Sequence, residues 1–125
     1  MKATKRILFV DDDATIREFV SMALTDEGYE VAIAAHGVAA LESLARTMPA
    51  LILLDIRMPI MDGWVFLKAY QLLPMPHAPV IVVTASRNMF RNQMPPEVSG
   101  FLAKPFDLDE LIDLVDEFVQ ISNGQ

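Results

Sequence analysis

Two short apolar segments of the chain each end on aspartate. Residues 7–10 run directly into the triplet Asp-Asp-Asp at 11–13, and residues 51–54 run into Asp55. A buried strand that stops on carboxylates delivers them to one edge of its sheet, where like charges a few ångströms apart repel by roughly 4 kcal/mol per pair at an effective dielectric near 20. A cation, a proton or a functional role usually accompanies such a cluster. The pattern therefore predicts a metal site on a parallel sheet.

The elements that would position these carboxylates alternate in type along the chain. Five short apolar runs are predicted to be strands, and their unbroken hydrophobic character is typical of strands buried on both faces of a parallel sheet. These runs are residues 6–10, 30–34, 50–54, 79–83 and 100–103. Strands that alternate with helices predict an α/β fold, a doubly wound five-stranded parallel sheet with right-handed crossovers.

Helical spacing of apolar residues predicts five helices. Their apolar stripes or approximate bounds are residues 16–24, 37–47, 63–73, 87–93 and 108–119. Gly28 is a plausible stop for the first helix, and Asp107 is a natural N-cap for the last. The fourth helix should be short or irregular, because Pro95 and Pro96 block its continuation after about two turns.

Length and composition set the limits. The 125 residues suffice for one compact domain, which we expect at residues 1–121, with a frayed end or linker stub at 122–125. The net charge of −7 argues against direct nucleic-acid binding. The apolar runs fall far short of the roughly 18 residues that span a bilayer, and Asp11 interrupts the first run too early for a signal peptide. We therefore expect no membrane insertion and a cytoplasmic location. With no cysteine, disulfide and thiolate chemistry are excluded.

Ligands of doubly wound sheets bind beyond the carboxyl ends of the strands, where the strand order reverses. Thr84, after the fourth apolar run, and Lys104, after the fifth, should emerge at this edge beside the aspartates. Oxygen ligands without His or Cys suit a hard cation such as Mg²⁺. Carboxylates, a divalent cation, a lysine and a hydroxyl together indicate phosphoryl transfer, in which an aspartate can be the nucleophile. We expect Asp13 to cap the first helix instead.

Four motifs, spaced over nearly the whole chain, resemble those of response-regulator receiver domains, the phosphoacceptor half of two-component signalling. They are Val10-Asp11-Asp12, Asp55-Ile56-Arg57-Met58-Pro59-Ile60-Met61-Asp62-Gly63, Thr84-Ala85 and Lys104-Pro105-Phe106. The resemblance implies a flavodoxin-like fold and a phosphorelay function. Asp55 would receive a phosphoryl group from the phosphohistidine of a histidine kinase or a histidine phosphotransfer protein. The chain would then be a phosphoacceptor read by an unknown downstream protein, not an enzyme that turns over external substrates.

The same resemblance implies a metal-binding role for several residues. Asp11 and Asp12 would bind Mg²⁺ or Mn²⁺, and Asp12 is the expected direct ligand of the two. Asp55 and the backbone carbonyl of Arg57 would complete the protein ligands. The Arg57 side chain lies two residues after the acceptor, a position that modulates phosphate loss in this family. A cation there would either shield the acyl phosphate from water or steer a donor's phosphate.

Three further residues receive roles from the resemblance. Thr84 would hydrogen-bond the phosphoryl group, and Lys104 would neutralise one of its oxygens. Phe101 would be the aromatic switch, whose ring rearranges as Thr84 moves toward the phosphate. A doubly charged phosphate creates new hydrogen-bond acceptors at one edge, and a bistable face around Thr84, Phe101 and the fourth helix would report them.

Other functions compete with this hypothesis. Residues 11–15 also look like the Asp-x-Asp-x-Thr motif of haloacid-dehalogenase-type phosphatases, with Asp11 as nucleophile and Asp13 as acid/base. That family needs an acidic pair at a strand end after the lysine, whereas the acids after Lys104 fall on an amphipathic helix. A second alternative is a degenerate receiver that acts only as a binding module, which the complete acceptor set disfavours. A flavodoxin-like FMN binder lacks support, because no Ser/Thr/Gly-rich loop follows the first strand.

The third predicted helix is more apolar than an amphipathic element needs. We expect Phe66, Leu67 and Tyr70 in the core. Trp64 and Val65 should be partly exposed, where they are either an interface or an ordinary scatter of exposed apolar side chains.

Overall fold

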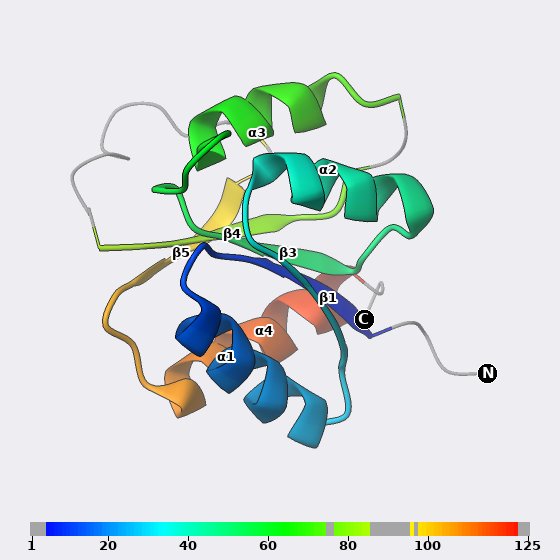
Figure 1. The fold of residues 1–125 in the computed structure, drawn as a ribbon. Coiled ribbons are helices and arrows are strands. Elements are labelled where there is room, and N and C mark those ends of the chain that lie inside the picture. The colour runs from blue at the N-terminus through cyan, green and yellow to red at the C-terminus, as the bar shows by residue number, and fades with distance from the viewer. Residues whose placement is uncertain (1–4, 75–76, 86–95, 97, 123–125) are drawn as a thin grey trace.

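Strands and helices alternate in the described chain up to the fourth strand (Figure 1). The structure, a computed structural model, describes residues 5–74, 77–85, 96 and 98–122. Its elements in chain order are β1 (Arg6–Val10), α1 (Ala14–Asp26), β2 (Glu30–Ala34), α2 (Gly37–Arg46), β3 (Leu51–Leu54), α3 (Gly63–Gln71), β4 (Val80–Thr84), β5 (Val98–Ala103) and α4 (Leu108–Ser122). In the part of the chain so described, no helix is long and apolar enough to cross a membrane.

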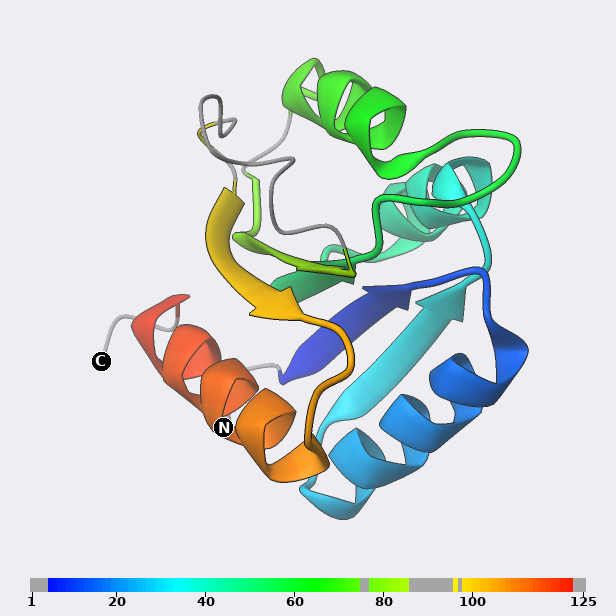
Figure 2. The same ribbon diagram turned by 90° about the vertical axis from the view of Figure 1, so that its left-hand side faces the viewer.

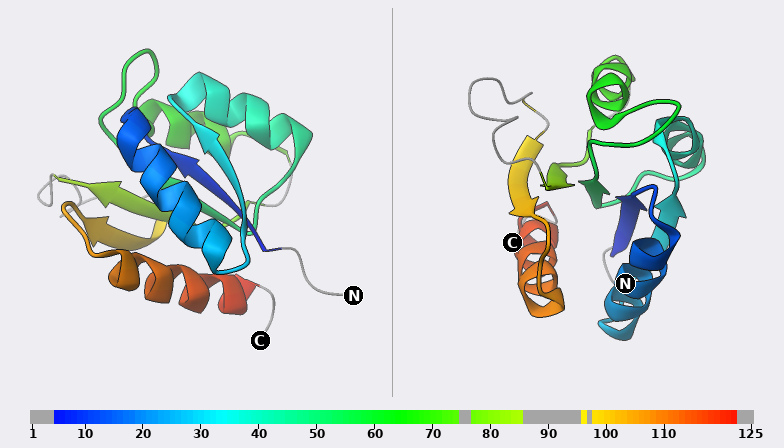
Figure 3. Two further views of the ribbon diagram at one scale, coloured as in Figure 1. Left: turned by 60° about the horizontal axis from the view of Figure 1, so that its bottom comes forward. Right: turned by 60° about the vertical axis from the view of Figure 1, so that its left-hand side comes forward.

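The strands form one parallel five-stranded sheet in the order β2-β1-β3-β4-β5 (Figure 2). Helices α2 and α3 cover one face, and α1 and α4 lie side by side on the other (Figure 3). The chain starts at β1, passes outward to β2 and then returns through β3 toward β5. The strand order therefore reverses between β1 and β3, and the predicted doubly wound α/β fold is confirmed.

Some predicted boundaries differ from the structure. β4 is Val80–Thr84, one residue later than predicted, so Thr84 belongs to the strand. β5 begins at Val98, two residues before the predicted start. Its first residues include Ser99 and Gly100, residue types that do not indicate a strand in the sequence. The pairing with β4 is also irregular there, because the register shifts between Val80 and Ile81. The helix predicted at 87–93 lies outside the described residues.

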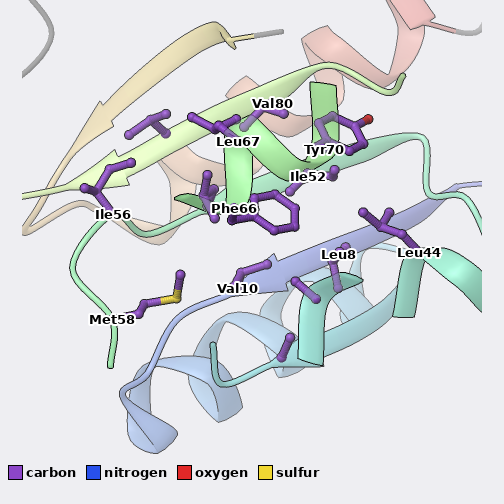
Figure 4. Packing of buried hydrophobic residues seen from close by; sticks show 14 residues of the cluster. Leu8, Val10, Leu44, Ile52, Ile56, Met58, Phe66, Leu67, Tyr70 and Val80 are labelled. Atoms are coloured by element: carbon purple, nitrogen blue, oxygen red, sulfur yellow. The ribbon is translucent and has the colours of Figure 1, made fainter. Parts of the chain in front are cut away.

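The sheet separates two apolar clusters. Along β1, Leu8 and Val10 point to the cluster beneath α2 and α3, while Ile7 and Phe9 point to the cluster beneath α1 and α4. Figure 4 shows the first cluster, in which Phe66, Leu67 and Tyr70 of α3 reach the strands, as expected from the sequence. Side chains that face both layers explain why the strand segments are apolar at every position.

Side chains fix the starts of the first three helices. Asp13 caps α1, since its carboxylate accepts from the N–H groups of Thr15 at 2.9 Å and Ile16 at 3.2 Å, which confirms the predicted capping role. Asp62 caps α3 by accepting from the Val65 N–H at 3.0 Å. α2 is capped by the Nδ1 atom of a histidine, His36, a residue that the sequence pattern did not indicate as a cap.

The start of α3 packs directly against the end of β3. Gly63 donates its N–H to the carbonyl of Ile56 at 2.8 Å. A Cβ atom on Gly63 would lie 2.8 Å from the carbonyl oxygen of Asp55 and 2.8 Å from the Cα of Ile56. These obstacles are backbone atoms, which cannot move without displacing the strand end. The loop that joins β3 to α3 therefore closes only around a glycine.

We expect Gly63→Ala to lower the free energy of unfolding by about 1–3 kcal/mol, the usual cost of overpacking. Gly37 also opens a helix, but the three atoms nearest to a Cβ there all belong to the Met61 side chain, with its Cγ at 2.6 Å. Because that side chain is flexible, Gly37→Ala should cost less. Urea denaturation of both variants measures the difference. Equal losses would show that the approach of α3 to β3 is not the limiting contact.

Candidate functional site

Four neighbouring strands deliver polar side chains to one edge of the sheet. Asp11 follows β1, Asp55 follows β3, Thr84 ends β4 and Lys104 follows β5. The backbone ladder continues into the site, because Asp11 donates its N–H to Ala34 at 3.0 Å and Asp55 donates to Val10 at 2.9 Å. Three of these side chains are buried, with exposed fractions of 0% for Asp11, 5% for Asp55 and 1% for Thr84. The residues singled out in the sequence are thus gathered where the strand order predicts.

Three carboxylates of this edge form a group that can hold a cation. One oxygen each from Asp11, Asp12 and Asp55 lies within 4.8 Å of the others, and Asp12 alone of the three is exposed. Carboxylate oxygens without nitrogen or sulfur donors suit a hard divalent ion that keeps some of its water. The third member of the triplet, Asp13, is engaged by the N-terminus of α1.

The ammonium group of Lys104 lies between two of the carboxylates. Its Nζ is 2.8 Å from an oxygen of Asp11 and 3.5 Å from an oxygen of Asp55. Its backbone N–H donates to the Thr84 carbonyl at 3.0 Å, and its peptide bond to Pro105 is cis. Burial alone lowers the pKa of Lys104, but the hydrogen bonds and charges of Asp11 and Asp55 raise it above its ordinary value. Lys104 is therefore a fixed positive charge of the site.

One lysine does not neutralise the buried acids. Burial, followed by the charge of Asp11, raises the pKa of Asp55 from 3.8 to about 6. Lys104 and the N–H of Arg57, which lies 3.4 Å from Asp55 Oδ1, lower this pKa only in part. The carboxylate of Asp55 thus carries unfavourable free energy that a proton or a further cation would relieve.

Asp11 is held in place by groups of α1 and its entry. Its side chain accepts from the Asp13 N–H at 2.9 Å, and its backbone carbonyl accepts from Arg17 Nη1 at 2.8 Å. Arg17 was not among the residues predicted for the site. The sequence marks Arg17 only as a basic residue one helical turn after the acidic triplet. Such a residue is ordinarily a solvent-exposed surface charge.

A hollow of about 620 Å³ lies beside the carboxylates. It is bounded by the loop after β3 and the first turn of α3 and is lined by Asp12, Ile56, Arg57, Met58, Pro59, Asp62 and Trp64. The exposed side chain of Arg57 therefore borders the site, as its place in the sequence suggested. The position of Trp64 in the wall was not predicted.

Phe101 lies within β5, the strand that precedes Lys104. It is half-buried in β5, paired in register with Val82, and packs against the cluster beneath α2 and α3. Its neighbour strand β4 ends at Thr84. A change in Thr84 and a change in the Phe101 ring would therefore involve adjacent strands.

The phosphatase alternative is not favoured by this geometry. It requires Asp13 as a general acid/base beside Asp11, but the Asp13 carboxylate accepts from two amide groups of the first turn of α1. It also gives no role to Asp55, which is one of the three carboxylates of the cluster.

Comparison with known proteins agrees with the geometry. Residues 7–116 match the family model described as response regulator receiver domain. The chain is 34% identical over 122 residues to sporulation initiation phosphotransferase F of Bacillus subtilis, covering 96% of this chain and 98% of that protein. It is 37% identical to the regulatory protein AtoC of Escherichia coli over 98% of this chain, but it spans only 27% of that longer protein.

A solved structure extends the likeness to three dimensions. The response regulator protein TrrA of Thermotoga maritima, in complex with Mg²⁺-BeF, superposes with a TM-score of 0.81 at 31% identity, covering 92% of this chain and 99% of that one. An aspartate cluster at the carboxyl edge of a five-stranded parallel sheet is typical of the phosphoacceptor site of such proteins. The chain belongs to the response regulator receiver domain family and is the receiver of a two-component system.

Proposed function

We propose that Asp55 is the residue that accepts the phosphoryl group, and that the donor is the phosphohistidine of a histidine kinase or a histidine phosphotransfer protein. The observation that carries this proposal is the Asp55 carboxylate itself, which lies 3.5 Å from Lys104 Nζ and clusters with the carboxylates of Asp11 and Asp12. An Asp55 oxygen attacks phosphorus, the phosphorus–nitrogen bond of the donor breaks, and the imidazole leaves with the electron pair. The product is an acyl phosphate on Asp55, which water later hydrolyses.

Asp11, Asp12, Asp55 and the backbone carbonyl of Arg57 would hold Mg²⁺ or Mn²⁺. Support comes from the all-oxygen donor set and from the raised pKa of Asp55, which burial and, after it, the charge of Asp11 cause and which a cation would lower. When bound, the ion supplies positive charge next to the transferring phosphoryl oxygens. The protein's part is to fix the acids, which Arg17 and the sheet ladder do for Asp11.

Lys104 and Thr84 would act on the phosphoryl group. Lys104 Nζ, 3.5 Å from Asp55, would neutralise one phosphoryl oxygen, and the hydroxyl of Thr84, the last residue of β4, would donate to another. Movement of Thr84 would then let the Phe101 ring rearrange on the neighbouring strand, and a downstream protein would bind the altered face. We propose no direct contact of this chain with nucleic acid.

Asp55→Asn should abolish labelling by acetyl phosphate in the presence of Mg²⁺, because the amide cannot form an acyl phosphate. Intact mass should rise by one phosphoryl group in the unmodified protein, and peptide mapping should locate it at Asp55. The matched control is Asp13→Asn, which keeps the cap of α1 and should be labelled normally. Labelling at Asp11, or steady release of phosphate from phosphate esters, would instead support the phosphatase alternative.

Mg²⁺ should stabilise the folded protein by about 2.7 kcal/mol at 100 times its dissociation constant. The effect should grow with pH, because a proton on Asp55 competes with the ion. Without divalent cations, the folded state binds more protons than the unfolded state between the pKa values of 3.8 and about 6, so stability should fall as pH rises through this window. Thermal melts at pH 5 and 7.5, with and without Mg²⁺, measure both trends. An Asp55→Asn protein that keeps the same pH dependence would contradict the assignment.

Arg57→Ala should shorten the lifetime of the phosphoryl group, because Arg57 is exposed and lines the hollow beside the carboxylates, where it would shield the acyl phosphate from water. Lys68→Ala removes an exposed cation of α3 that does not line this hollow, and it should leave the lifetime unchanged. Loss of label after removal of acetyl phosphate gives the rate. An unchanged rate of phosphoryl loss in Arg57→Ala would contradict a role of Arg57 in protecting the acyl phosphate.

A further inference from the structure

Ile60 has a backbone conformation that its side chain disfavours. Its φ is 69°, the single positive value among the non-glycine residues that the structure describes. The N–H of Met61 donates to the carbonyl of Pro59 at 2.7 Å, which closes a three-residue γ-turn with Ile60 at its apex. Positive φ is strained for a β-branched residue, and γ-turns of this hand are rare for that reason. Glycine or asparagine would adopt the same turn at lower cost.

The surroundings hold this turn on both sides. On one side of the loop, Gly37 of α2 donates its N–H to the Met61 carbonyl at 3.2 Å. On the other, Asp62 caps α3 and Gly63 donates to Ile56 at 2.8 Å. Strained residues persist where neighbouring contacts determine the backbone, and they concentrate at functional sites. The strain at Ile60 is therefore built into a rigid loop.

Packing of the Ile60 side chain does not offset this strain. Its exposed fraction is 80%, and it is absent from both apolar clusters. It stands instead beside the hollow next to the carboxylates, because its chain neighbour Pro59 lines that hollow together with Arg57 and Trp64. An exposed apolar side chain on a constrained turn, beside a hollow that Trp64 and Arg57 line, suits a binding anchor, because Trp and Arg are enriched among the residues that contribute most to binding.

We propose that Ile60 is the apolar anchor by which this chain docks its phosphohistidine-bearing donor. This inference rests on the proposed function and names a contact for it. A donor must bring its phosphoryl group to Asp55, which clusters with Asp12. Asp12 lines the hollow, and so does Pro59, the chain neighbour of Ile60. A docked donor would therefore cover the side of the hollow where Ile60 lies. Ile60 would enter an apolar depression beside the donor histidine while Arg57 faces the phosphoryl group. Holding the side chain on a fixed turn limits the entropy lost on docking.

The test compares two phosphate donors on the same variants. The protein donor is a histidine phosphotransfer protein phosphorylated on its histidine, chosen as the one that loads the unmodified chain fastest, and the small donor is acetyl phosphate. Ile60→Asn tolerates the positive φ and removes the apolar side chain, so its melting temperature should rise. Its transfer rate from the protein donor should fall about tenfold or more. Its labelling by acetyl phosphate should stay unchanged.

Two controls separate docking from other effects. Leu72, at the far end of α3, is an apolar residue with an exposed fraction of 84%, similar to the 80% of Ile60. Leu72→Asn should leave both rates unchanged. Ile60→Leu keeps an apolar side chain and should transfer at close to the original rate. Normal transfer to Ile60→Asn would overturn the inference while the proposed function stands, and loss of both labelling reactions would assign Ile60 to the chemistry instead. A dimer in sedimentation that Ile60→Asn dissociates would assign the residue to self-association and also overturn it. Failure of Asp55 labelling in the unmodified chain, in contrast, would remove the proposed function itself.

Discussion

The repulsion between the carboxylates of Asp11 and Asp55 is the constraint on which the rest of the site depends. Parallel strands in the order β1-β3 place both groups at one edge, and burial strengthens their interaction. Lys104, delivered by β5, offsets part of it, yet burial and Asp11 still raise the pKa of Asp55 to about 6. The remaining negative charge makes the site selective for positive charge. It favours the binding of a divalent cation, and it holds the Lys104 ammonium group between the two carboxylates.

Much of this arrangement was predictable because it follows from patterns of several residues. Strand segments that are apolar at every position predicted burial on both faces, and Leu8 and Phe9 do face opposite clusters. In a parallel sheet the carboxyl ends of the strands lie at one edge, so Asp11, Asp55 and Thr84 could be assigned to one site from the sequence alone. Asp13 was separable from its neighbours because a helix pattern begins directly after it.

What could not be predicted depends on single contacts in three dimensions. The cap by His36 uses a residue type that seldom caps helices, and the bond from Arg17 to the Asp11 carbonyl joins residues whose spacing has no general signature. Trp64 borders the hollow only because α3 begins against the end of β3. The positive φ of Ile60 contradicts its residue type, and local preference therefore predicts the opposite conformation. In each case tertiary contacts outweigh the local preference.

The interactions that are unfavourable in free energy at this site are confined to a few groups. The backbones of Asp11, Asp55 and Lys104 continue the hydrogen-bond ladder of the sheet, so the framework of the site shares the stability of the core. Among the residues that the structure describes around the site, the carboxylates carry repulsion and the turn at Ile60 carries strain. A cation or a proton relieves the carboxylate repulsion, and docking would bury the exposed Ile60 side chain while its strained turn stays as it is. Because the same sheet supports both features, neither binding event requires the fold to rearrange.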